Sequence, residues 1–199
     1  MKKIFVSLLL VCIFLLACDK EQNNQEKIVS QNYYWYQGSK INLDSDSSVF
    51  YLEYAKTSDA PQLIRTAIAA AFKIHDTAIH QLSDTQFIIK SATKIAASAF
   101  TSQPANLKYT APLLTTKNAI MIVLPHIVVQ LKEGHSIEEV INLYKNNLTV
   151  LKNRGFNTYI LQSNSKSSKE VLDISNALYE KSGNVIWSEP EFYTNYKLF

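Results

Sequence analysis

The side chains that could carry chemistry are few: four histidines, two cysteines and some neighbouring carboxylates. His75 and His80 are five residues apart, whereas two metal ligands on one helical face require a spacing of four. His126 and His135 fall at predicted strand and helix ends, without an acidic ligand pattern beside them. Glu138–Glu139 lies on the polar side of a predicted helix, where solvated charge is the common explanation. We therefore expect no metal site and no acid–base pair.

The chain also lacks the short motifs of common enzyme classes. It contains no G-x-S-x-G sequence and no glycine-rich phosphate loop, and it has four glycines in all. Both cysteines, Cys12 and Cys18, lie near the N-terminus, so the remaining chain offers no thiol nucleophile, thiolate ligand or disulfide. We expect a protein that is not an enzyme and needs no cofactor.

The N-terminus has the pattern of an export signal. Lys2-Lys3 precedes an apolar run over Ile4–Ala17, which is shorter than the about 20 residues of a membrane-spanning helix. The run ends in Leu15-Leu16-Ala17-Cys18, which resembles a bacterial lipobox. This resemblance implies that residues 1–17 are a lipoprotein signal peptide and that Cys18 is acylated. The alternative is an ordinary secretory signal with an incidental cysteine.

Residues 18–31 are polar and contain no aromatic side chain. Such a segment cannot bury enough apolar surface to fold, so we expect a flexible tether. The protein would then be lipid-anchored in the cell envelope, with the membrane as one partner. The outer membrane is the expected location, and the sequence leaves open whether the protein faces the periplasm or the cell surface.

The pattern over residues 126–192 predicts strand, helix, strand, strand, helix, strand. Apolar residues recur with a period of two in the strands and at helical spacing in the helices. The expected elements are a strand at 127–132, a helix at 136–145, strands at 148–151 and 156–161, a helix at 167–183 and a strand at 185–187. This βαββαβ order is typical of the ferredoxin-like fold, a four-stranded antiparallel sheet with both helices on one face. The other face stays free for a partner.

Local signals support these boundaries. Ser136 with Glu139, and Ser167 with Glu170, have the spacing of capping boxes at helix starts. The sequence Asn153-Arg154-Gly155 is typical of a turn between two strands, because glycine accepts positive φ.

Residues 32–125 predict a second, more divergent α+β subdomain. Its expected elements are a β-hairpin at 33–43, a strand at 49–54, a helix at 61–74, a strand at 87–89, an irregular or edge-like segment at 103–116 and a buried strand at 119–124. We expect the aromatic residues Tyr33–Tyr36 to pack on the sheet below them, and carbohydrate stacking is the alternative. Residues 193–199 form a C-terminal tail, and the fold class as a whole is α+β.

The charge pattern argues against a nucleic-acid partner. The formal net charge of +3 includes Lys2-Lys3, and the other basic residues are interleaved with acidic ones. The sequence shows no basic stripe and no aromatic RNA-binding signature. We therefore expect no binding to nucleic acid.

Several stretches together carry a resemblance to a known family. They are Asn32–Tyr54, Ile127–Lys132, Asn157–Leu161, Val171–Gly183 and Trp187–Phe192. In this order they resemble the N-terminal prodomains of subtilisin-like (S8) serine proteases of Bacteroidota. The family has a helix ending in a Leu-Tyr-Glu-Ser-Gly-like run and a strand ending in Glu-Pro-Asn-Phe. This chain has Lys181 inserted in the first run and Glu191 in place of the asparagine.

The resemblance implies a partner and a mode of action. Family prodomains pack their open sheet face on the protease and lay their C-terminal residues along the substrate cleft. The sequence ends at Phe199, and we expect no catalytic domain after it. The chain is therefore similar to a prodomain that stands free of its enzyme, and we expect a lipid-anchored inhibitor of a subtilisin-like protease.

If the tail binds as in the family, Phe199 fills the primary pocket and Tyr196 the pocket three residues upstream, with Lys197 and Leu198 between them. An extended tail of this kind adds as a strand to an edge in the protease cleft. The alternatives are a frayed terminus with incidental aromatic residues and a non-inhibitory envelope-binding or structural lipoprotein on the same scaffold.

Overall fold

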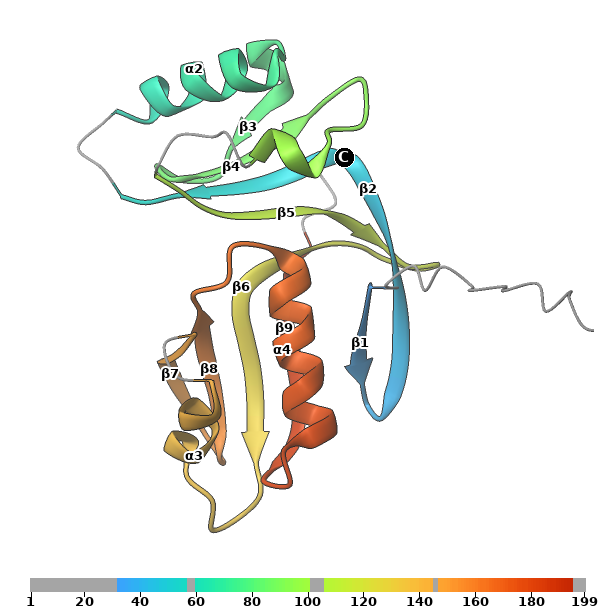
Figure 1. Ribbon diagram of the computed structural model, residues 1–199, viewed down its shortest axis with the longest axis vertical. Helices are drawn as coiled ribbons and strands as arrows, with labels where there is room; N and C mark the ends of the chain where they lie inside the picture. The colour runs from blue at the N-terminus through green and yellow to red at the C-terminus, as the bar shows by residue number, and fades with distance from the viewer. Residues whose placement is uncertain (1–31, 57–59, 101–105, 145–146, 195–199) are drawn as a thin grey trace, which may run out of the picture. The chain divides into compact units, whose positions relative to one another are not determined.

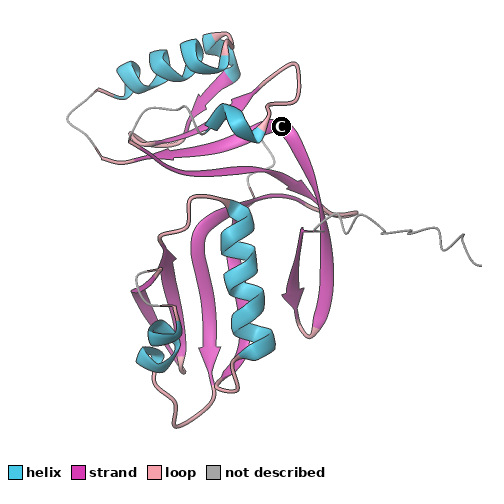
Figure 2. Cartoon of the chain, in the orientation of Figure 1, coloured by secondary structure: helices cyan, strands magenta, loops and turns pink. Residues whose placement is uncertain are grey.

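The computed structural model describes residues 32–56, 60–100, 106–144 and 147–194, and residues 31–199 form one compact unit. The fold is α+β, mostly an antiparallel open sheet with three α-helices in the described ranges (Figures 1 and 2). The helices are α2 (Pro61–Phe72), α3 (Ile137–Leu143) and α4 (Ser168–Lys181), with short 3₁₀ helices η1 (Asp76–Ala78) and η2 (Ala97–Phe100). The strands are β1 (Asn32–Tyr36), β2 (Ser39–Tyr54), β3 (Ile79–Gln81), β4 (Gln86–Lys90), β5 (Leu107–Thr115), β6 (Ile120–Leu131), β7 (Leu148–Gly155), β8 (Thr158–Ser163) and β9 (Val185–Tyr193).

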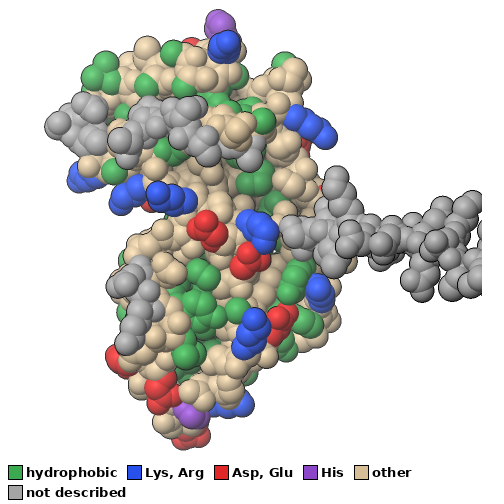
Figure 3. Space-filling view, viewed as in Figure 1, with side chains coloured by type: hydrophobic (Ala, Val, Ile, Leu, Met, Phe, Trp, Pro, Cys, Tyr) green, Lys and Arg blue, Asp and Glu red, His purple; other side chains and the backbone are tan. Residues whose placement is uncertain are grey.

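The strands join in the order β3-β4-β2-β5-β6-β8-β7, with β1 added to β2 and β9 added to β6. Every pair of neighbouring strands is antiparallel. The expected α+β class is therefore confirmed. Figure 3 shows acidic and basic side chains interspersed on the face that it presents.

The predicted N-terminal hairpin is present as β1 and β2. Tyr36 pairs with Ser39, and the two residues between them, Gln37 and Gly38, have φ of 48° and 75°. Positive φ at both positions is typical of a two-residue hairpin turn whose twist matches that of the strands. The structure differs after the turn, because β2 runs without a break from Ser39 to Tyr54 where the sequence predicts two separate strands.

The last part of β2 is buried on both faces. Phe50, Leu52 and Tyr54 pack with α2 in one apolar cluster. Val49 and Tyr51 belong to the larger cluster, which also contains the buried side chains of β6, α3 and α4. Because successive side chains of a strand point to opposite faces, β2 serves both cores. The two expected subdomains, 32–125 and 126–192, therefore share one main core.

The segment predicted to be irregular, 103–116, contains a well-defined strand. β5 pairs with β2 along most of its length, although Pro112 lies within it. Proline cannot donate a ladder hydrogen bond and is tolerated at bulges and sheet edges. The register shift of β2 between Asp46 and Phe50 faces Pro112, and β5 meets β6 only at Leu114 and Thr115. The proline marks a break in the pairing, and the strand continues through it.

The central strand β6 runs through the boundary expected at 125/126. Its N-terminal part pairs with β5 and its C-terminal part with β8 and β9. Ile127, Val129 and Leu131 are fully buried and pack in one cluster with apolar residues of α3 and α4. Figure 1 shows α4 running alongside β6. The alternation that predicts this strand therefore also selects the face that the helices cover.

Two local predictions are wrong. The turn between β7 and β8 is not at Asn153-Arg154-Gly155, because β7 continues to Gly155 and the turn is formed by Phe156 and Asn157. Ser136 begins α3 without a side-chain capping bond. The carboxylate of Glu139 instead accepts a hydrogen bond from Asn184 Nδ2 at 2.7 Å and lies 3.1 Å from His135 Nδ1.

The second capping signal is confirmed. Ser167 Oγ accepts from the backbone N–H of Glu170 at 3.5 Å, and Glu170 Oε2 accepts from the N–H of Lys166 at 3.0 Å. The carboxylate reaches one residue further back than in the expected box. Both bonds satisfy backbone donors at the start of α4 that the helix itself leaves unpaired.

A single hydroxyl ties β5 to β6 inside the shared core. Tyr109 Oη donates to the carbonyl oxygen of Val123 at 2.9 Å, and both residues are buried. Tyr109→Phe leaves that carbonyl without its partner, so we expect the free energy of unfolding to fall by about 1–3 kcal/mol. Because the core is shared, urea unfolding followed by circular dichroism and by tryptophan fluorescence should give one transition. Tyr36→Phe, at an exposed ring, is the control. Two separate transitions would contradict the shared core.

Candidate functional site on the open sheet face

The strands β9, β6, β8 and β7 present one face that none of the three described helices covers. Residues paired directly across antiparallel strands share a face, and His126, Val128 and Gln130 of β6 alternate with the buried residues under α3 and α4. The residues paired with these three are Gln162, Ile160 and Thr158 on β8 and, for Val128 and Gln130, Glu189 and Trp187 on β9. We call this set, with Glu191 and Arg154 that bond to it, the open face.

The side-chain amide of Gln130 forms two hydrogen bonds in the part of the open face nearest the β7–β8 turn. Gln130 Oε1 accepts from the indole N–H of Trp187 at 2.6 Å, and Gln130 Nε2 donates to the carbonyl oxygen of Phe156 at 3.3 Å. The indole can only donate and the carbonyl can only accept, so the orientation of the amide is fixed. Gln130 thereby links β9 to the tip of the β7–β8 hairpin.

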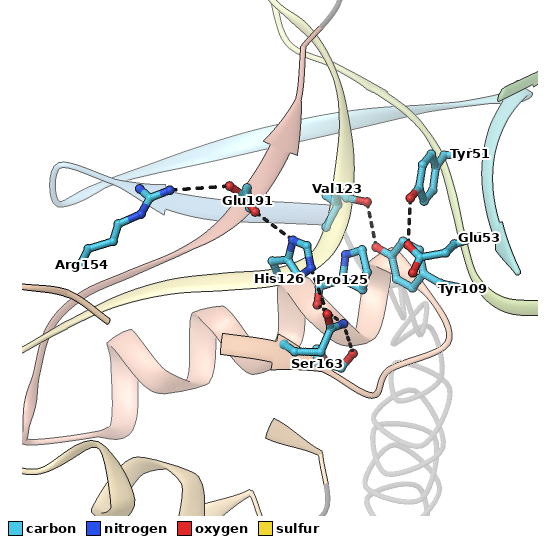
Figure 4. Close-up of polar contacts among 10 residues, drawn as sticks. Tyr51, Glu53, Tyr109, Val123, Pro125, His126, Arg154, Ser163 and Glu191 are labelled. Carbon is cyan, nitrogen blue, oxygen red and sulfur yellow. Dashed lines mark hydrogen bonds and ion pairs between the residues drawn. The ribbon is translucent and has the colours of Figure 1, made fainter. Parts of the chain in front are cut away.

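A second polar network lies at the upper end of the open face (Figure 4). Gln162 Nε2 donates to the carbonyl oxygens of Pro125 and Ser163, each at 3.0 Å. Gln162 Oε1 therefore faces His126 Nε2 at 3.0 Å, while Glu191 Oε2 lies 2.8 Å from His126 Nδ1. Each ring nitrogen of His126 therefore lies within hydrogen-bond distance of a side-chain oxygen, one from β8 and one from β9.

Charged side chains complete the network. Arg154 Nη2 lies 3.9 Å from Glu191 Oε1, and the two side chains are 48% and 33% exposed. An exposed ion pair of this length contributes about 0–1 kcal/mol, so it orients Glu191 more than it stabilises the fold. Burial raises the pKa of the Glu189 carboxyl, which is paired with Val128 on the same face. The open face thus combines an aromatic ring, amides and both signs of charge.

A polar cleft of about 470 Å³ adjoins the upper network. Burial raises the pKa of the Tyr51 hydroxyl, which donates to Glu53 at 2.8 Å on the cleft wall, and it raises that of Tyr109. The lining residues are Glu53, Leu107, Lys108, Tyr109, Pro125, Gln162, Ser163, Asn164, Ser165 and Lys166. Ligand pockets are mostly apolar, so this charged cleft is a weaker candidate than the open face.

Two aromatic residues of the β1–β2 hairpin, Tyr33 and Trp35, make intramolecular contacts. The Trp35 indole N–H and the Tyr33 hydroxyl both donate to Glu180 Oε1, at 2.8 Å and 2.9 Å. The Trp35 ring lies 5.2 Å from the ring of Tyr179, and Asn176 Nδ2 donates to the Tyr33 carbonyl. These rings pack mainly on α4, whereas the sequence predicts packing on the sheet. Their engagement with the protein itself disfavours carbohydrate stacking.

The predicted site residues lie outside the described residues. This holds for Cys18, for Tyr196, Lys197, Leu198 and Phe199, and for the tether at 18–31. The described chain reaches Thr194, and Tyr193 still pairs with Ile122 at the end of β9. The sequence gives no signal for the bonds of Gln130, His126 and Gln162, because their partners come from distant segments.

Phe156 is also missed by sequence reasoning, which places it at the start of a strand. In the structure it occupies the hairpin tip with φ of 50° and is 95% exposed. Large apolar residues rarely combine such exposure with positive φ. No pattern of neighbouring residues distinguishes this position from a strand end.

No protein-family model matches the chain, and neither curated proteins nor solved structures show a detectable match to it. Within the described residues, no group of three or more His, Cys, Asp or Glu side chains could hold a metal ion. No helix in that part of the chain is long and apolar enough to cross a membrane.

Glu180 provides a test of the hairpin contact and its pH dependence. Glu180→Ala removes the acceptor of Trp35 and Tyr33, and we expect a loss of about 1 kcal/mol, kept small by solvent exposure. The bond from Trp35 holds the pKa of Glu180 below its usual value. Its contribution is therefore present above the unfolded-state pKa of about 4.3 and is lost as pH falls through the lower folded value.

Glu180→Gln keeps an acceptor but cannot titrate. Urea unfolding at pH 7 and pH 3 should therefore show a larger loss of stability for the wild type than for Glu180→Gln. Equal losses in the two proteins would contradict the role assigned to the carboxylate.

Proposed function

We propose that this chain is a lipid-anchored inhibitor of a subtilisin-like serine protease, docking through its open face and filling the substrate cleft with its C-terminal tail. In this proposal, the segment from β6 to β9 has the ferredoxin-like fold of protease propeptides. The element order βαββαβ and the strand order β9-β6-β8-β7 support that assignment, because they are the order of the split-βαβ fold.

The observation that carries the proposal is the open face, which none of the described helices covers. Val128, Gln130 and Trp187 are half-buried, and the apolar groups of Val128 and Trp187 lie beside satisfied polar groups. Ile160, which pairs with Val128, is buried. Protein interfaces combine an apolar centre with aromatic residues and a polar rim. The amides of Gln130 and Gln162 are already oriented, so docking would require little further ordering of side chains.

The path of β9 supports the proposed contact between the C-terminal tail and the substrate cleft. β9 borders the open face through Trp187, Glu189 and Glu191, and the tail follows its last residue, Tyr193. A tail that continues an edge strand is suited to add to a strand of a protease cleft. Tyr196 and Phe199 would then supply the two buried anchors, each contributing about 1.5–3 kcal/mol. Lys197 and Leu198 would lie between them, and acylated Cys18 would hold the complex at the membrane.

Titration of protease activity tests the proposal. The full chain in detergent micelles is added to subtilisin and to the secreted subtilisin-like proteases of the same bacterium. We expect stoichiometric loss of activity for at least one of them. Full activity of every protease at saturating concentrations of the chain would overturn the proposal and favour the non-inhibitory envelope lipoprotein.

Two variants distinguish the contribution of the C-terminal tail to inhibition from that of the open face. Deletion of residues 196–199 should weaken inhibition by orders of magnitude while leaving the unfolding midpoint unchanged, since it leaves β9, which ends at Tyr193, intact. Thr158→Arg adds charge and bulk to the open face and should also weaken inhibition. Arginine at exposed Thr66, on α2 and outside the open face, is the matched control. Unchanged inhibition after the deletion would show that the tail assignment is wrong.

A further inference from the structure

The tip of the β7–β8 hairpin carries a residue that does not suit its conformation. Gly155 pairs with Thr158, and the two residues between them, Phe156 and Asn157, have φ of 50° and 55°. A two-residue turn with positive φ at both positions favours asparagine, aspartate and glycine. Positive φ in a bulky side chain is uncommon and strained.

Burial does not compensate for this strain. The Phe156 side chain is 95% exposed, so its ring contributes little to the core. The turn between β1 and β2 also has positive φ at both positions, but it carries glutamine at the first position and glycine at the second, where no side chain is strained. Strained residues with no structural benefit are concentrated at functional positions.

The strained tip is held in place from several sides. The carbonyl oxygen of Phe156 accepts from Gln130 Nε2 and from Thr158 Oγ1, each at 3.3 Å. The N–H of Leu131 donates to the Asn157 carbonyl at 2.9 Å, and the N–H of Gly155 donates to Asn153 Oδ1 at 2.8 Å. The backbone of the tip is therefore fixed to β6, and the ring is displayed from a rigid support.

The surroundings indicate the chemistry of a partner. An aromatic side chain on a fixed backbone has only two torsions to order when a partner buries it, and a few central aromatic or arginine residues dominate most protein interfaces. Lys152 and Arg154 lie on the same strand, close to the tip, and both are exposed. A complementary surface therefore has an apolar pocket with carboxylates at its rim.

We propose that Phe156 is an anchor residue that inserts into an apolar, acid-rimmed pocket on the surface of the target protease. This inference rests on the proposed function and adds a contact separate from the tail in the substrate cleft. The strain in the turn is retained because the ring gains its contacts only in the complex.

Phe156→Asn tests the anchor, because asparagine suits the turn but cannot fill an apolar pocket. The full chain in detergent micelles is titrated against the protease that the wild type inhibits, and the unfolding midpoint is measured in the same buffer. We expect inhibition to weaken about tenfold or more, while the unfolding midpoint rises because the strain is relieved. A misfolded variant would lower the midpoint, so the two readouts together exclude that explanation.

Two control variants match the two effects of the substitution. Gln37→Asn relieves the corresponding position of the β1–β2 turn and should raise the midpoint without changing inhibition. Leu63→Gln removes a side chain of α2 that is 61% exposed and should leave inhibition unchanged. If Phe156→Asn inhibits as well as the wild type, or lowers the midpoint, the anchor is wrong and the proposed function stands. If the wild type inhibits no protease, both are wrong.

Discussion

The alternation of side chains along β6 is the constraint on which the rest of the structure depends. Ile127, Val129 and Leu131 enter the core under α3 and α4, so His126, Val128 and Gln130 must occupy the opposite face. A shift of the pairing by one residue would exchange the two sets and place polar groups in the core. The pairing of β6 with β8 and β9 therefore fixes the fold and the composition of the open face together.

Residues of two motifs on which the proposed relation to protease prodomains rests contact each other within this chain. Tyr33 and Trp35 from the N-terminal motif meet Tyr179 and Glu180 from the C-terminal motif. Their contacts hold the β1–β2 hairpin on α4. Two motifs far apart in the sequence are therefore in direct contact. It also means that the motifs stabilise the scaffold, whereas the proposed binding groups belong to the other face of the sheet.

In both the open face and the tip of the β7–β8 hairpin, glutamine side chains hydrogen-bond to backbone carbonyls of other segments. Polar side chains with fixed amide orientations, Gln130 and Gln162, connect neighbouring strands and hold the groups that a partner would meet. Preorganisation of this kind lowers the entropic cost of association. The strain at Phe156 is compatible with stability because the bonds of Gln130 and Leu131 fix the turn. The same bonds fix the backbone from which the ring projects.

The sequence by itself determined the elements whose signals are local. The Gln37-Gly38 turn, the helix after Ser167 and the alternation in β6 depend on neighbouring residues, and all three are found in the structure. Other features depended on distant partners. Glu139 bonds to Asn184 rather than completing a cap, and Phe156 forms the turn because Gln130 and Leu131 hold it there. Only the tertiary structure decided that β2 is one strand buried on both faces. It also decided that β5 continues through Pro112, because the pairing of β5 with β2 and a bulge opposite the proline outweigh the local preference of proline against a strand.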